Sequence, residues 1–204
     1  MLVGIDFDNT IVGYDALFHR AAVDQGLVPA ELSATKVAVR DYLRSIGRED
    51  EWTELQGHVY GPRMGEAAPF PGVLDFFSWA RHCRLEVAIV SHRTHHPFIG
   101  PKHDLHEAAR GWVDTFLRRP GLIDHDDVFF ELTKEEKLAR IGAVGCTHFV
   151  DDLPEILLAD GFPPATAPIL FDPERHHNSV DRLLALESWA ALQRHFESLW
   201  APAH

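Results

Sequence analysis

The chain has 204 residues, of which 46% are hydrophobic and 25% are charged, and this composition is typical of a folded globular protein. Lysine and arginine number 19 against 31 aspartates and glutamates, and the formal net charge of −12 disfavours binding to the phosphate backbone of a nucleic acid. No apolar run approaches the roughly 20 residues of a membrane span and no basic leader precedes the first apolar segment, so we expect a cytoplasmic protein with no membrane partner.

The first predicted strand, Leu2–Phe7, is an apolar run. It contains Asp6, and Asp8 follows it directly. The interval that follows it has helical patterns at Tyr14–Gln25 and Leu32–Ile46 and no convincing strand. A cluster of proline and glycine at Pro69–Gly72 then ends this interval. We therefore expect a helical cap subdomain at 13–68, inserted into a core domain made of 1–12 and 69–204.

From residue 69 onward, strand patterns alternate with helix patterns. Helical periodicity predicts helices at 73–80, at 105–116 and around Leu138 and Ile141. The pattern from Ser179 to Trp200 predicts a closing helix with Ser179 as its N-cap. Further strands are predicted at Leu85–Ser91, Val128–Glu131, His148–Val150 and Ile169–Phe171. The alternation predicts an α/β fold with a doubly wound, Rossmann-like parallel sheet of about five strands.

Two acidic residues, Asp6 and Asp8, stand at the end of the first predicted strand. Two neighbouring carboxylates repel each other unless a cation lies between them, and Mg²⁺ favours such oxygen ligands. A carboxylate can also attack phosphorus, while a second acid protonates the leaving oxygen and later activates water. The alternative interpretation is an ordinary Asp-rich turn in which Thr10 caps a helix.

Further polar residues follow other predicted strands, at the edge where doubly wound sheets bind ligands. Ser91 ends one strand, and Asp151 with Asp152 ends another. Lys134 and Lys137 lie in the first turn of the predicted helix after Glu131, where the helix dipole disfavours a cation unless it neutralises a nearby anion. Lys137 is our first choice for that role, and Lys134 is the second.

This order of acids, hydroxyl, lysine and acids resembles the four motifs of the haloacid dehalogenase-like hydrolase superfamily, most of whose members are phosphatases. The resemblance implies that Asp6 is the nucleophile, Asp8 the general acid and base, and Ser91 a phosphate-binding residue. It implies that Lys137 or Lys134 neutralises the phosphate. Magnesium would be held by Asp6, the backbone carbonyl of Asp8 and Asp152, with Asp151 beside it or in the outer coordination sphere. The superfamily also places a helical cap between its first and second motifs, where 13–68 falls.

The expected activity is that of a magnesium-dependent phosphohydrolase, which cleaves a small phosphorylated metabolite through an aspartyl-phosphate. Asp8 argues against dehalogenation, because a leaving halide needs no proton. A phosphoryl transferase or mutase, a phosphonate hydrolase and a non-catalytic metabolite-binding module are the alternatives.

Other polar residues are candidates for substrate binding. Thr10, His92 and Arg93 stand next to the acids and to Ser91 in the sequence, and we expect them with Ser91 to contact phosphate or substrate. The histidine-rich stretch that begins at His92 suits a solvated loop, a substrate contact or a zinc site made by His95, His96 and His103. Four cations of the insertion are either substrate contacts or solvated side chains, namely Lys36, Arg40, Arg44 and Arg63.

Overall fold

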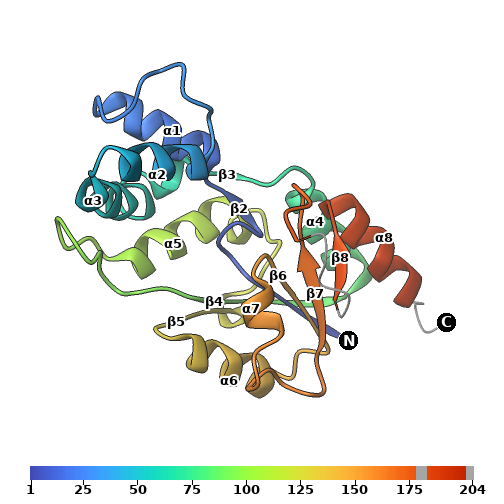
Figure 1. Cartoon of the computed structure of the whole chain (residues 1–204). Helices are drawn as coiled ribbons and strands as arrows, with labels where there is room; N and C mark the ends of the chain where they lie inside the picture. The colour runs from blue at the N-terminus through green and yellow to red at the C-terminus, as the bar shows by residue number, and fades with distance from the viewer. Residues whose placement is uncertain (178–182, 201–204) are drawn as a thin grey trace. The chain divides into compact units, whose positions relative to one another are not determined.

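The computed structural model describes residues 1–177 and 183–200, and the chain folds into two compact units (Figure 1). The first unit contains Met1–Ile11, Pro69–His92 and Thr115–His204. The second contains Val12–Ala68 and Arg93–Asp114. Within the described residues, no helix is long and apolar enough to span a bilayer.

The first unit is built on a six-stranded sheet with the order β5-β4-β1-β6-β7-β8. Every neighbouring pair in this order is parallel, so the predicted α/β fold with a doubly wound parallel sheet is confirmed. The strands are β1 (Leu2–Ile5), β4 (Glu86–His92), β5 (Val128–Glu131), β6 (His148–Asp151), β7 (Ala167–Phe171) and β8 (Leu184–Leu186). All but β8 were predicted, with ends that differ by at most two residues.

The prediction of one closing helix from Ser179 to Trp200 is wrong in its first half. Leu184–Leu186 forms β8, which pairs with β7, and the closing helix α8 covers Trp189–Leu199. Its N-cap is Ser188, whose side chain accepts a hydrogen bond from the backbone N–H of Ala191. Ser179, the predicted N-cap, lies outside the described residues.

The helices of the first unit are α4 (Val73–Cys83), α6 (Lys134–Val144), α7 (Pro154–Leu157) and α8, with a short η3 turn at His125–Asp127. The π-helical turn η2 (Asp114–Arg118) begins at the last residue of the second unit and continues in the first. Phe76 of α4 packs against Trp189 and Phe196 of α8 with ring centroids 5.1 and 6.0 Å apart. Leu138 and Ile141 of α6 join a buried cluster with Val90, Phe149, Ile156, Leu157 and Leu170. Both cysteines are free thiols, with Cys146 buried and Cys83 partly buried.

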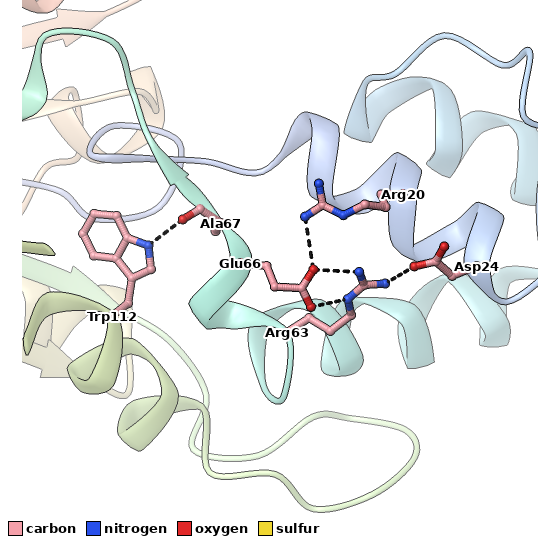
Figure 2. A network of polar contacts seen from close by, with 6 residues as sticks. All are labelled: Arg20, Asp24, Arg63, Glu66, Ala67 and Trp112. Carbon is pink, nitrogen blue, oxygen red and sulfur yellow. Dashed lines mark hydrogen bonds and ion pairs between the residues drawn. The ribbon is translucent and has the colours of Figure 1, made fainter. Parts of the chain in front are cut away.

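The second unit is helical, with α1 (Asp15–Asp24), α2 (Lys36–Ser45), α3 (Glu49–Tyr60), the 3₁₀ turn η1 (Met64–Glu66) and α5 (Leu105–Val113). The two-residue strands β2 (Val12–Gly13) and β3 (Ala68–Pro69) pair as a separate small sheet. Within this unit, the Arg63 guanidinium binds Asp24 and Glu66, Arg20 binds Glu66, and the Trp112 indole donates a hydrogen bond of 2.8 Å to the Ala67 carbonyl (Figure 2). Polar contacts therefore connect α1 to η1, and α5 to the residue that follows η1.

Candidate active site

Asp6 lies immediately after β1, a central strand between β4 and β6. Its backbone N–H donates to the Val150 carbonyl at 2.8 Å, so the chain still follows β6 at this residue. Gly4 allows this close packing, because a Cβ there would lie 2.6 Å from both the Cys146 Sγ and the Phe149 ring. The strand thereby fixes the Asp6 carboxylate, which is only 4% exposed.

Two side chains from two elements bond the Asp6 carboxylate. Its Oδ1 accepts a hydrogen bond of 2.8 Å from the Ser91 hydroxyl at the end of β4, and one of 2.6 Å from the Lys137 ammonium on α6. Lys137 also donates to Asp151 Oδ2 at 2.6 Å. Burial lowers the pKa of Lys137, but the charges and hydrogen bonds of Asp6 and Asp151 together raise it above its ordinary value. Lys137 is therefore a buried ammonium shared by two carboxylates.

Asp151 and Asp152 stand at the end of β6 and complete an acidic group with Asp6. One carboxylate oxygen from each residue lies within 4.8 Å of the others. Burial raises the pKa of Asp151, and burial together with the charges of Asp6 and Asp151 raises the pKa of Asp152 to about 8. Lys137 offsets one of these negative charges, so the group has the composition of a divalent-cation site.

The structure separates the two candidate lysines. Lys137 is 1% exposed and contacts Asp6, as described above. Lys134 lies one turn earlier on α6, and its ammonium donates to the backbone carbonyl of Glu155 at 2.5 Å. A capping box begins α6, because the Thr133 hydroxyl accepts from the Glu136 N–H and the Glu136 carboxylate accepts from the Thr133 N–H.

Asp8, Thr10 and His92 belong to the same unit as Asp6. Asp8 is partly buried, and its charge acts on both Asp152 and His92. Thr10 is fully buried, its carbonyl accepts from the Trp189 indole at 3.0 Å, and no described residue bonds its hydroxyl. Burial, followed by the positive charge of Lys137, lowers the pKa of His92, which favours the neutral form of this partly buried imidazole.

Arg93 and the histidine-rich stretch after it fall in the second unit. The Arg93 guanidinium donates to the Leu105 carbonyl at 3.1 Å. The His95 ring stacks on His106 at 4.9 Å, and His95 also lies 3.4 Å from the Asp104 carboxylate. Among the described residues, the acidic group of Asp6, Asp151 and Asp152 is the one set with metal-binding spacing, and this argues against a zinc site made by the histidines.

The sequence matches no protein-family model and no curated protein. Solved structures do resemble it. A hydrolase of the HAD (haloacid dehalogenase) superfamily from Ehrlichia chaffeensis is 12% identical with a TM-score of 0.59, and the match covers 97% of this chain and 96% of that one. A protein described as a predicted phosphatase from Clostridium acetobutylicum is 11% identical with a TM-score of 0.60, over 97% and 98% of the two chains.

A HAD family hydrolase from Deinococcus radiodurans, solved with bound phosphate and sodium, is 15% identical with a TM-score of 0.58, over 99% and 98% of the two chains. These matches run over nearly the whole of each chain and agree with the parallel sheet described above. The chain therefore has the fold of the haloacid dehalogenase-like hydrolases.

Proposed function

We propose that this protein is a haloacid dehalogenase-like phosphohydrolase, which uses magnesium and an aspartyl-phosphate intermediate to cleave a small-molecule phosphomonoester. The observation that carries the proposal is the Asp6 carboxylate, which is bonded by Ser91 and Lys137 and grouped with Asp151 and Asp152. The fold it shares with a hydrolase solved with bound phosphate and with a protein described as a phosphatase supports the same chemistry.

In the proposed first step, an oxygen of Asp6 attacks phosphorus and forms the new O–P bond. The bond from phosphorus to the leaving oxygen breaks, and Asp8 gives that oxygen a proton. Ser91 and Lys137 both bond Oδ1 of Asp6, so we assign the attack to Oδ2. Asp8 next takes a proton from the attacking water, the Asp6–phosphorus bond breaks, and inorganic phosphate leaves.

The acidic group suits magnesium, because carboxylate oxygens are the ligands this ion prefers. A bound cation would also offset the burial and the mutual repulsion of the carboxylates, which raise the pKa of Asp152. Asp6, Asp152 and the backbone carbonyl of Asp8 would hold the ion. Asp151 would orient the residues around the ion, since its Oδ2 accepts a hydrogen bond from Lys137 and its Oδ1 accepts one from the Leu153 N–H. When bound, magnesium supplies positive charge that stabilises the charge spread over the transferring phosphoryl oxygens.

We further propose that 13–68 serves as the cap that admits and selects the substrate. Its helices are of the kind that the resemblance predicts for this interval. Thr10 and His92 are proposed phosphate or substrate contacts, Thr10 because its buried hydroxyl has no described hydrogen-bond partner and His92 because it follows Ser91.

The proposal is tested by measuring inorganic phosphate released from a panel of phosphorylated metabolites, with Mg²⁺ and with EDTA. We expect turnover with Mg²⁺, none with EDTA, and at least a ~10³-fold loss of kcat in Asp6→Asn, which keeps the shape of the side chain but removes the nucleophile. Asp160→Asn is the matched control, because Asp160 is an exposed acid of the same unit. Turnover near the wild-type rate in Asp6→Asn would contradict the mechanism.

A further inference from the structure

We propose that Lys134 is a positioning residue of the magnesium site, which together with Lys137 holds segment 151–155 and thereby fixes the orientation of the Asp152 carboxylate. This inference rests on the proposed function and deepens it, because it adds a residue that acts through Asp152 and contacts neither the ion nor the substrate. All the residues concerned belong to the first unit.

Two lysines of α6 bond the two ends of segment 151–155. The Lys137 ammonium donates to Asp151 Oδ2 at 2.6 Å. The Lys134 ammonium, one helical turn earlier, donates to the backbone carbonyl of Glu155 at 2.5 Å. One face of α6 thus bonds the segment both at its start and at its end.

A hydrogen bond inside the segment completes this arrangement. The Leu153 N–H donates to Asp151 Oδ1 at 2.9 Å, which closes a tight turn. Asp152 lies within that turn, and its carboxylate is one of the three with metal-binding spacing. The backbone is therefore held on both sides of Asp152, and the two lysines supply the outer contacts.

The Glu155 carbonyl is open to Lys134 because α7 has only four residues. The backbone N–H groups that follow bond other carbonyls of this helix, namely Leu158 N–H to Pro154 and Ala159 N–H to Ile156. A helix carbonyl without a backbone donor needs another partner, and the Lys134 ammonium provides it. Lys134 is itself the first residue of α6, where the helix dipole disfavours a cation, and this acceptor offsets that cost.

The start of α6 is rigid enough to serve as an anchor. Its capping box satisfies N–H groups of the first turn, and the Leu132 N–H donates to Glu136 Oε2 at 3.0 Å as well. Apolar side chains of α6 and α7 also share one buried cluster, namely Leu138, Ile141, Ile156 and Leu157. The apolar contacts hold the later part of α7, and Lys134 holds the part that is closer in sequence to Asp152.

The charge of Lys134 acts in the opposite direction to its proposed positioning role. After burial and Lys137, the charge of Lys134 also lowers the pKa of His92, so it reaches the site. Removing this charge alone would strengthen the binding of a cation. Loss of positioning would weaken binding, because magnesium demands near-ideal ligand geometry. The sign of the change in Mg²⁺ affinity therefore separates the two effects.

The test is a calorimetric titration of the metal-free protein with Mg²⁺. In Lys134→Met we expect the Kd for Mg²⁺ to rise about tenfold, as is usual for residues that orient metal ligands. In assays of phosphate release, kcat at saturating Mg²⁺ should stay within about twofold, because the chemical groups are intact. Arg140→Met removes a cation of the same helix that bonds Glu131 at 2.6 Å, and its Kd should stay within about twofold of the wild-type value.

An unchanged or lower Kd in Lys134→Met would overturn the inference. A tenfold or greater loss of kcat at saturating Mg²⁺ would do so too, since it would place Lys134 on the phosphate. If Mg²⁺ binds but no phosphate is released from any metabolite, the hydrolase proposal fails, and the comparison of Kd values still decides the role of Lys134.

If the wild-type protein binds no Mg²⁺, the magnesium site of the proposed function fails. Amide hydrogen exchange of Leu153, followed by NMR in EDTA, then decides whether Lys134 holds the segment. Exchange that is at least about fivefold faster in Lys134→Met than in the wild-type protein and in Arg140→Met supports this role, and equal rates refute it.

Discussion

The ammonium of Lys137 is nearly inaccessible to solvent and bonds both Asp6 and Asp151. Replacing it with methionine keeps much of the volume but leaves two carboxylates close together in a buried site. We expect Lys137→Met to lower the free energy of unfolding of the metal-free protein by about 3–5 kcal/mol, the usual cost of breaking a buried pair. Urea denaturation in EDTA measures this loss.

Lys134→Met is the control for that experiment. The Lys134 ammonium bonds a backbone carbonyl and is partly exposed, so we expect a loss of about 1 kcal/mol or less. Similar losses in the two variants would show that Lys137 is not the buried counter-charge described here.

Asp8 is assigned both proton transfers, so its replacement should separate the two chemical steps. Asp8→Asn cannot activate water, and we expect turnover to fall about 10²–10⁴-fold while phosphate stays on Asp6. Intact-protein mass spectrometry after mixing with substrate should detect one added phosphoryl group. Fast turnover, or slow turnover with no covalent species in rapid-quench samples, would assign the proton transfers to another residue.

At the level of residues, the sequence predicted the members of the acidic site better than it predicted the lysine. Asp6, Ser91, Asp151 and Asp152 each lie in or just after the last residues of a parallel strand, and such strand ends meet at one edge of the sheet. The dipole argument applied equally to Lys134 and Lys137, since both lie in the first turn of α6. Only packing separates them, because α6 turns Lys137 toward β1 and Lys134 toward α7.

Among the elements, β8 was missed because its pattern is ambiguous. Leu184 and Leu186 fit the period of two of a strand, but together with Leu183, Trp189 and Leu192 they also fit a helical period. The strand exists through backbone pairing with β7, a long-range contact that local periodicity cannot reveal. The same limit applies to α5: its periodicity predicts a helix but does not indicate that Arg93–Asp114 joins the second unit.

The corrected start of α8 leads to a prediction for this element. The Ser188 side chain satisfies the N–H of Ala191, so Ser188→Ala should lower the free energy of unfolding by about 1 kcal/mol. Ser198→Ala is the matched control, because the exposed Ser198 hydroxyl only donates to the His195 carbonyl within the same helix. Chemical denaturation of both variants measures the difference, and equal stabilities would argue against an N-cap at Ser188.

For the whole molecule, the acidic site should set how stability depends on pH. The pKa of Asp152 is raised to about 8 in the folded protein, mainly by burial, against about 3.9 in an unfolded chain. At pH values between about 4 and about 8, Asp152 is therefore protonated in the folded state and ionised in the unfolded state. Its contribution to stability is fully present below pH ~4 and is lost as the pH rises through about 8.

In EDTA, thermal denaturation of the wild-type protein should accordingly show a Tm that falls as pH is raised from about 6 to about 9. Asp152→Asn cannot titrate and should flatten this slope, whereas Asp160→Asn, at an exposed acid, should retain it. Added Mg²⁺ needs the ionised carboxylate, so it should raise Tm more at pH 9 than at pH 6 in the wild-type protein and little in Asp152→Asn. An unchanged slope in Asp152→Asn would mean that a group other than Asp152 causes the pH dependence of Tm.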